Sequence, residues 1–162
     1  MEIRQVRFTH VDALRLIEAV QAEYVHRYGG PDATPLDPSM FDAPEGAFFV
    51  GYVDGLPVAM GGWRFRSDVI AFGRSRPAEI KRMYVASNAR RTGLATQILD
   101  HLESTASDAG ADLMVLETGI EQPEAIALYL LSGYEPVVAF GHYKWSERSR
   151  YYGKPLGVPP LA

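Results

Sequence analysis

Apolar residues recur along this chain in two patterns, one with the period of a strand and one with the period of a helix. The alternation over residues 2–8 predicts a first strand. A helix is expected next, because Thr9 and Asp12 form a variant of the capping box and apolar residues then recur at helical spacing up to the break at 29–31. Residues 29–45 contain four prolines and little periodicity, which predicts a long ordered loop.

Strands and helices alternate through the rest of the chain. The apolar segments 47–53 and 56–65 flank Asp54 and Gly55, a pair that strongly favours a β-hairpin. Residues 67–76 fit either a strand extension or a connecting loop. Beyond them the pattern predicts strands over 78–85, 112–118, 134–140 and 146–156, and helices over 93–109 and 123–132. This order predicts an α+β protein with a mixed sheet covered by helices.

Length and composition narrow the protein class. With 162 residues, 47% of them hydrophobic and 22% charged, the chain fits one globular domain, which we expect over residues 1–156 with a tail over 157–162. The net charge of −4 argues against a broad nucleic-acid-binding surface. The first residues lack the apolar run of a signal peptide, and no apolar stretch is long enough to span a bilayer. We therefore expect a soluble cytoplasmic protein without nucleic-acid or membrane partners.

Cysteine and histidine usage excludes further chemistries. The chain has no cysteine, which removes disulfides, thiolate catalysis and cysteine-ligated zinc. Its four histidines are scattered and include no H-x-x-x-H pair, so no metal site is expected.

One segment, RRTGLA at residues 90–95, places two arginines and a glycine where a helix is expected to begin. A helix N-terminus presents unpaired N–H groups and a partial positive charge, and it binds phosphate readily. Gly93 would permit close approach of a ligand, and Arg90 and Arg91 would add charge for phosphate oxygens. A pyrophosphate ligand fits this description, although neither the Rossmann nor the P-loop glycine pattern is present. Taken alone, the segment also fits an ordinary helix start.

The sequence downstream of residues 90–95 favours a binding site over an ordinary helix start. The strand LMVLET and the segment QPEAIALYLLSGY follow the motif. With them the chain resembles the GNAT superfamily of acyl-CoA-dependent N-acetyltransferases. The family motif [RQ]-x-x-G-x-[GA] matches residues 90–95, and its A-x-x-x-Y-x-x-x-G-[FY] segment matches residues 125–134. The preceding strand, IKRMYV, is also typical, whereas Gln122 stands where many members have asparagine.

This resemblance implies a GNAT fold, with a mixed central sheet of six to seven strands flanked by about four helices. The two central parallel strands, 78–85 and 112–118, would splay apart and hold acetyl-CoA as the cofactor between them. The positions expected to contact its pantetheine arm and phosphates are Met83, Tyr84, Val85, Arg90, Arg91, Thr92, Gly93, Leu94, Ala95, Thr96, Glu117, Thr118, Gln122, Ala125, Leu128 and Tyr129.

The resemblance also implies direct attack of an amine on the thioester. Tyr129 occupies the position where the family commonly places a tyrosine that protonates the leaving thiolate, although a packed aromatic is the alternative. The candidates for the general base are Glu79 and His142, and each also fits an ordinary structural role. Glu117 lies on the partner strand and could face the cleft or form a structural pair. A backbone N–H near residues 83–85 would stabilise the oxyanion.

The acceptor is not determined by the resemblance, because the fold and donor site serve many acceptors. The long loop, the preceding helix end and the C-terminal strands should build its pocket. The candidate substrate-binding residues are Tyr24, Tyr28, Trp63, Arg64 and Tyr143, with Arg27 and Arg150 nearby in the same set. Arginines with aromatics would suit a small amine that also bears a carboxylate, such as an amino acid, or these residues serve only as surface charges and packing groups.

Two alternatives to a small-molecule acetyltransferase remain from the sequence. One is an acyl-CoA-binding or sensing domain that has lost turnover, and the other is an enzyme that acetylates protein N-termini or lysines. GNAT-like proteins often form homodimers, but no interface signature is recognisable in this chain.

Overall fold

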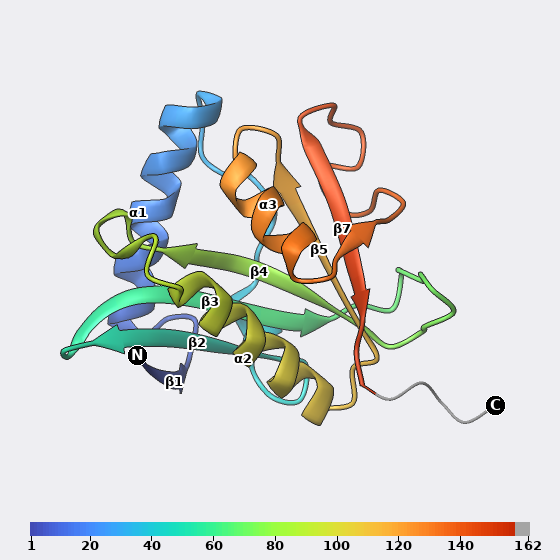
Figure 1. Ribbon diagram of the computed structural model, residues 1–162, viewed down its shortest axis with the longest axis horizontal. Helices are drawn as coiled ribbons and strands as arrows, with labels where there is room; N and C mark the ends of the chain where they lie inside the picture. The colour runs from blue at the N-terminus through green and yellow to red at the C-terminus, as the bar shows by residue number, and fades with distance from the viewer. Residues whose placement is uncertain (158–162) are drawn as a thin grey trace.

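The computed structural model describes residues 1–157 and contains a seven-stranded sheet with helices against both faces (Figure 1). The strands are β1 (Glu2–Val6), β2 (Gly46–Val53), β3 (Leu56–Phe65), β4 (Pro77–Val85), β5 (Leu113–Gly119), β6 (Glu135–Pro136) and β7 (Ser149–Pro155). The helices are α1 (Val11–Tyr28), α2 (Leu94–Asp108) and α3 (Pro123–Leu131), with short 3-10 helices η1 (Pro38–Phe41) and η2 (Ser87–Ala89).

The spatial order of the strands is β1-β2-β3-β4-β5-β7-β6. β4 and β5 run parallel, and the other neighbouring strands are antiparallel. The predicted α+β class with a mixed central sheet is therefore confirmed, with three α-helices and two 3-10 helices among the described residues.

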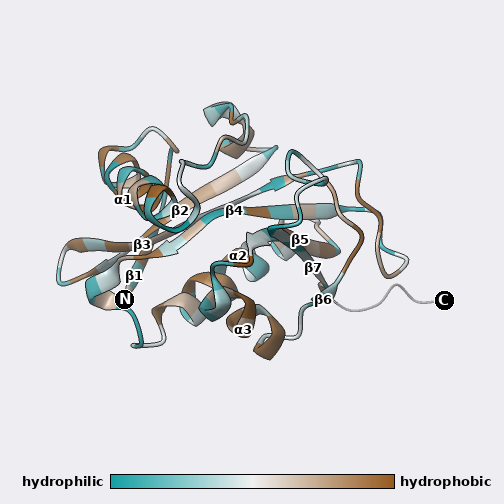
Figure 2. Cartoon of the chain, turned by 90° about the horizontal axis from the view of Figure 1, so that it is seen from above, coloured by the Kyte–Doolittle hydropathy of each residue, from teal (hydrophilic) through white to brown (hydrophobic). Residues whose placement is uncertain are grey.

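Separate hydrophobic cores lie on the two faces of the sheet (Figure 2). α1 covers one face, where Leu16 packs in a cluster with Phe48 of β2. α2 and α3 cover the other, where Ile98 packs in a cluster with Phe49. Since neighbouring residues of a strand point to opposite faces, β2 can serve both cores at once.

α1 begins and ends at residues with specific cap geometry. Its N-cap is His10, whose Nδ1 accepts a hydrogen bond from the Asp12 N–H at 3.1 Å. The expected capping box on Thr9 is therefore wrong, because the helix begins later and Thr9 lies outside the cap position. At the other end Gly29 adopts a left-handed conformation, with φ of 80°, and donates its N–H to the Val25 carbonyl.

Replacing Gly29 with alanine should lower the free energy of unfolding by about 1 kcal/mol, because a left-handed backbone is costly for a residue with a Cβ. A Cβ at Gly29 would meet no atom within 4 Å, so no clash adds to this effect. Gly30 has equally open surroundings but lies outside the left-handed region. Gly30→Ala is therefore the matched control and should be neutral or slightly stabilising. Chemical denaturation measures both variants, and equal destabilisation would contradict the cap assignment.

The C-terminal part of the sheet differs from the prediction. The strand expected over residues 134–140 pairs with β7 only at β6. Beyond β6 the Val137 N–H still donates to the Tyr151 carbonyl at 3.0 Å, and the chain then leaves the sheet so that Phe140 packs beside Val69 in a third cluster. The final strand begins at Ser149 rather than at residue 146, because the residues before it form turns.

The ambiguous segment 67–76 is a connecting loop, with an isolated bridge between Ala71 and Arg74. Of the expected tail over 157–162, residues 158–162 lie outside the described residues. Among the helices of residues 1–157, none combines the length and apolarity needed to cross a bilayer.

β4 and β5 separate soon after they pair (Figure 1). Their parallel register runs from Pro77 opposite Leu113 to Glu79 opposite Val115. β4 also contains an irregularity towards β3, between the pairs Met60–Tyr84 and Gly62–Lys81. There Arg82 has a φ of 57°, as in a bulge that re-aims the strand. The predicted splay between the central parallel strands is confirmed, and it leaves one edge of β4 open.

Candidate functional site

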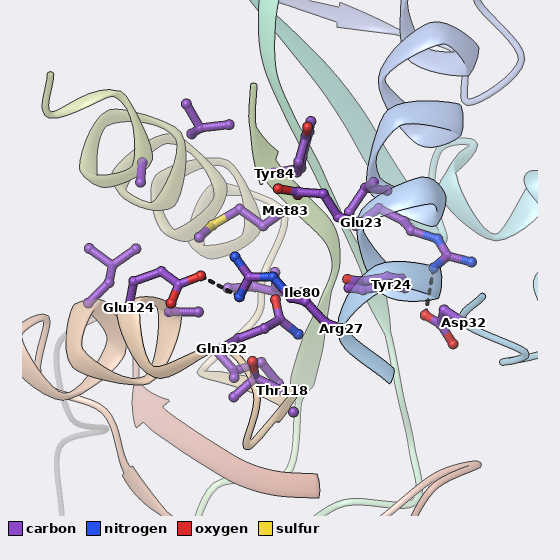
Figure 3. A pocket seen from close by; sticks show the side chains of 18 of the residues that line it. Glu23, Tyr24, Arg27, Asp32, Ile80, Met83, Tyr84, Thr118, Gln122 and Glu124 are labelled. Atoms are coloured by element: carbon purple, nitrogen blue, oxygen red, sulfur yellow. Dashed lines mark hydrogen bonds and ion pairs between the residues drawn. The ribbon is translucent and has the colours of Figure 1, made fainter. Parts of the chain in front are cut away.

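A cavity of about 850 Å³ lies in the opening between β4 and β5 (Figure 3). α1 bounds one side, and the N-terminal ends of α2 and α3 bound the other. All the residues expected to contact the cofactor line it except Thr92, whose hydroxyl bonds to the Ala89 carbonyl instead. The structure thus brings together residues that are far apart in the sequence, while their roles stay predictions.

The N-terminus of α2 forms one end of the cavity. Gly93 is its N-cap, with φ of 80°, and no side chain caps the first turn. A Cβ built on Gly93 would meet no atom within 4 Å, so the space in front of the backbone is open. Leu94, Ala95 and Thr96 line the cavity beside it. Free N–H groups in an open, uncapped first turn fit an anionic ligand such as a phosphate.

The two arginines of the motif have different surroundings. Arg90 donates from Nη2 to both Glu23 carboxylate oxygens, at 2.8 and 2.7 Å, and from Nε to the Val85 carbonyl at 3.0 Å. Its guanidinium also lies over the Tyr84 ring. Arg91 is exposed at the cavity and forms no ion pair within residues 1–157. Arg91 is therefore the arginine of the pair that is available to an incoming anion.

Tyr129 of α3 lies deep in the cavity wall. The side chain is 6% exposed, and its ring packs edge-on against Tyr134 with centroids 5.6 Å apart. Its hydroxyl makes no hydrogen bond with another residue of the described chain. Burial raises the pKa of Tyr129 above its ordinary value, so the hydroxyl stays protonated at neutral pH. A protonated and unengaged hydroxyl at a cavity wall can donate to a bound group.

Glu117 of β5 is a largely buried carboxyl group in the same cavity. Its Oε1 accepts a hydrogen bond from Ser149 Oγ at 2.8 Å. Burial raises the pKa of Glu117 above its ordinary value and outweighs the opposing effect of the Ser149 hydrogen bond. A carboxylate with a raised pKa is a better proton acceptor near neutral pH than an exposed one.

α1 is tied to α3 across the cavity mouth. Arg27 contacts Glu124 at 2.6 Å and donates to the Glu121 carbonyl at 2.8 Å (Figure 3). The Tyr28 hydroxyl lies 3.4 Å from the amide nitrogen of Gln122. These contacts place the end of α1 against the start of α3, and they use Gln122 for an internal bond.

The residues expected to bind the acceptor lie in different parts of the structure. Tyr24, Tyr28 and Tyr143 line the cavity. Trp63 does not, because it faces the α2 side of the sheet, where its indole N–H donates to Thr105 Oγ1 at 3.0 Å. Arg64, the next residue of β3, faces the opposite side and lines a smaller neighbouring cavity. The assignment of Trp63 to substrate binding is therefore corrected.

Arg150, a further arginine of that expected set, lines neither cavity. Its Nη1 donates to the carbonyls of Glu147 and Ser149, both at 2.9 Å.

The two expected base candidates also lie outside the main cavity. Glu79 is buried against Arg64, Arg66 and Lys81, and His142 is exposed on a loop. Both line the smaller cavity and not the one that contains Tyr129. Glu117, in contrast, lines the same cavity as Tyr129.

Asp32 and Arg82 are cavity residues that the sequence pattern did not indicate. Arg82 Nη1 contacts Asp32 at 2.5 Å, and Asp32 also accepts from Thr34 and Tyr143. Burial acts to raise the Asp32 pKa, but these hydrogen bonds and the Arg82 charge outweigh it and hold the pKa below its ordinary value. The Asp-x-Thr spacing of an Asx turn in the long loop was the available signal. Among residues 1–157, no cluster of acidic residues and histidines could hold a metal ion.

Comparison with known proteins agrees with this geometry. A family model described as Acetyltransferase (GNAT) family matches residues 15–134. The chain is 37% identical to an IAA acetyltransferase from Azospirillum brasilense over 78 residues, which are 48% of this chain and 51% of that protein. The chain thus spans about half the length of the curated relative it matches.

Solved structures show the same fold over nearly the whole chain. A protein from Klebsiella pneumoniae assigned as an acyl-CoA N-acyltransferase is 27% identical, with a TM-score of 0.75 over 96% of this chain and 97% of that one. An aminoglycoside 6'-N-acetyltransferase complexed with coenzyme A is 14% identical, with a TM-score of 0.71 over 99% of this chain and 100% of that one. The second likeness concerns the fold alone.

Proposed function

Because the chain belongs to the acetyltransferase (GNAT) family, we propose that it transfers the acetyl group of acetyl-CoA to the primary amine of a small molecule. The amine would attack directly while both substrates are bound. The observation that carries this proposal is a single cavity that joins an uncapped helix N-terminus, the open edge of β4 and Tyr129. These are the features needed to bind a phosphorylated thioester and to protonate its sulfur.

The residues of the cavity fit acetyl-CoA, which supplies an acetyl group already activated as a thioester. The cavity volume of about 850 Å³ is in the range of pockets that bury a small-molecule ligand. The backbone N–H groups at the start of α2 would hold the pyrophosphate, and Met83 and Val85 on the open edge of β4 would pair with the amides of the pantetheine arm. A related fold has been solved with coenzyme A bound, which supports the same cofactor here.

The Arg91→Ala variant should raise the Kd of CoA about 5- to 10-fold, because it removes an exposed charge-assisted hydrogen bond to phosphate. Titration calorimetry at low and high salt measures this loss, which should shrink at high salt as the charge is screened. Arg15, exposed on α1 and outside the cavity, provides the matched control variant Arg15→Ala. Equal Kd values for both variants would remove Arg91 from the phosphate site.

The chemistry requires that one proton leaves the amine and one reaches the sulfur. The nitrogen–carbon bond forms as the carbon–sulfur bond breaks. Both Glu117 and Tyr129 line the cavity, where Glu117 would accept the amine proton and Tyr129 would donate to the sulfur. A backbone N–H of the bulged part of β4, near residues 83–85, would stabilise the negative charge that develops on the acetyl oxygen.

The test of the proposed function is an assay of acetyl-CoA against a panel of primary amines, with free thiol as the readout. The panel includes small amines and peptides with a free N-terminus or a lysine. Thiol release that depends on a small amine supports the proposal, and release with peptides alone supports the protein-acetylating alternative. Thermal stabilisation by CoA without amine-dependent thiol would identify a binding domain instead. A protein that neither binds CoA nor releases thiol would overturn both.

A further inference from the structure

A second cavity, of about 280 Å³, adjoins the first near the paired ends of β4 and β5. Glu117 and Tyr143 line both cavities and therefore mark their boundary. The other walls come from β3, β4 and the loops at 34–35 and 140–142. Charged side chains dominate the wall formed by β3 and β4, unlike the mixed lining of the first cavity.

Cations outnumber carboxylates on this wall. The buried carboxylate of Glu79 lies 3.2 Å from Arg64 Nε and 3.1 Å from Arg66 Nη1. The Lys81 ammonium lies 3.7 Å from Oε2, the other carboxylate oxygen of Glu79. Arg66 also pairs with Asp68 at 2.7 Å. Three cations therefore share two carboxylates on this wall, and the remaining carboxylate of the cavity, Glu117, lies across from them on β5.

Lys81 has the most unused binding capacity of these cations. Its ammonium carries three donors, and its contact with Glu79 is too long for a hydrogen bond. No other residue of the described chain accepts from it, although its side chain is only 15% exposed. Arg64 donates only from Nε, so both terminal nitrogens of its guanidinium lack a partner among residues 1–157. Partly exposed cationic donors that no residue of the described chain engages, at a cavity wall, suit an anionic ligand.

Glu117 provides the opposite charge at the other end of the cavity. Its Oε1 is held by Ser149, and its second carboxylate oxygen has no partner within residues 1–157. Burial is the main cause that raises the Glu117 pKa, and the nearby Lys81 charge partly opposes it. Lys81 and Glu117 line the same cavity of about 280 Å³, so one small ligand in it can contact both.

We propose that the acceptor carries a carboxylate in addition to its primary amine, as an α-amino acid does. The carboxylate binds to Lys81 and Arg64 in the second cavity, and the amine lies at Glu117, facing the first cavity. This inference rests on the proposed acetyltransferase function and names the substrate class of that site. Lys81 and the terminal nitrogens of Arg64 offer a carboxylate donors that no residue of the described chain uses, whereas an amine without an anionic group would bring its own positive charge towards Lys81 unpaired.

The first experiment compares each L-amino acid with the amine that has the same side chain but no carboxylate, such as phenylalanine with phenethylamine. Thiol release from acetyl-CoA gives kcat/KM for each pair. For at least one amino acid, kcat/KM should be about 100-fold higher than for its decarboxylated amine. This is the effect expected when a charge-assisted contact is lost in a site built for it. Equal or better turnover of the decarboxylated amines throughout would overturn the inference.

The second experiment uses Lys81→Ala, which leaves Glu79 paired with Arg64 and Arg66 and should therefore fold. Its KM for the preferred amino acid should rise at least about 10-fold, while kcat and the Kd of CoA change by less than about 2-fold. KM for the decarboxylated amine should not change. Lys81→Arg should restore most of the loss because it keeps the charge, and Arg15→Ala is the surface control.

The two experiments separate failure of the substrate class from failure of the proposed function. If no compound releases thiol although CoA binds, the acetyltransferase function itself fails, and this inference fails with it. If amines without a carboxylate are good acceptors and Lys81→Ala affects both kinds of acceptor equally, the function stands and the carboxylate site is wrong.

Discussion

Tyr129→Phe is expected to lower kcat by about 100-fold, the low end of the effect of a positioned proton donor, and to leave the Kd of CoA within about 2-fold. The substitution removes only the hydroxyl, which forms no hydrogen bond with another described residue, and it keeps the ring that packs against Tyr134. Since burial raises the Tyr129 pKa, the hydroxyl is protonated throughout the neutral range and ready to donate. Steady-state thiol release and calorimetry with CoA give the two quantities.

Tyr134→Phe is the matched control for this prediction. Tyr134 is equally buried and packs against Tyr129, but its hydroxyl donates to Glu103 at 2.8 Å rather than lining the cavity. This variant should lose about 1 kcal/mol of stability with little change in kcat, because it loses only a structural hydrogen bond. If Tyr129→Phe keeps normal turnover, or if both variants lose it alike, Tyr129 acts as a packing residue.

Glu117→Gln is expected to lower kcat/KM by about 100-fold or more, because the amide cannot accept a proton from the amine. The wild-type kcat/KM should fall as the pH decreases through the raised pKa of Glu117, where the carboxylate becomes protonated. In the glutamine variant this acid limb should be absent, since the titrating group is gone. A pH profile of thiol release measures both effects.

Stability measurements separate this loss from unfolding. The folded-state pKa of Glu117 lies above its unfolded value, mainly because of burial. The stability that protonation contributes is therefore present below the unfolded pKa and is lost as the pH rises through the folded one. At neutral pH the glutamine variant should be at least as stable as the wild type, and its amide oxygen can still accept from Ser149. Glu18→Gln, at an exposed position of α1, is the control.

Comparison with Glu79→Gln distinguishes the two carboxyl groups. Glu79 neutralises Arg64, Arg66 and Lys81, so its loss should destabilise the protein by leaving buried cations unpaired. The acid limb assigned to Glu117 should nevertheless remain in this variant. Its disappearance there would transfer the base role to Glu79, as the strand position alone had suggested.

Arg90 and Arg91, the two arginines of the motif, are adjacent in the sequence but have different partners in the folded chain. Adjacent arginines before a helix predict a phosphate site equally for both. The fold gives Arg90 a carboxylate partner in Glu23, which lies on α1 and far away in the sequence. Arg91 has no such partner within the described chain and faces the cavity. A sequence pattern can identify the charge cluster, but tertiary contacts decide which charge is free.

Local pattern was sufficient for much of this protein. The helix start at residues 90–95, the hairpin at Asp54 and Gly55 and the helix that carries Tyr129 depend on neighbouring residues, and the structure contains all three. The order of these elements also predicted the mixed sheet, because crossover helices require parallel neighbours. The C-terminal strand over 134–140 was overestimated, since apolar residues that pack under a loop resemble those of a strand.

The orientation of individual side chains depended on the tertiary structure. Trp63 and Arg64 are adjacent in β3, and only the sheet register shows that one packs in the core under α2 while the other enters the second cavity. Glu79 and Glu117 are both carboxylates on central strands. Three cations, on β3, on β4 and just after β3, pair with Glu79, whereas Glu117 lines both cavities at their boundary. The sequence by itself determined the family, the sheet and the uncapped helix start at Gly93, because these follow from local backbone preferences. Only the tertiary structure decided which charges face the two cavities, because their partners lie on strands and loops that meet only in the folded chain.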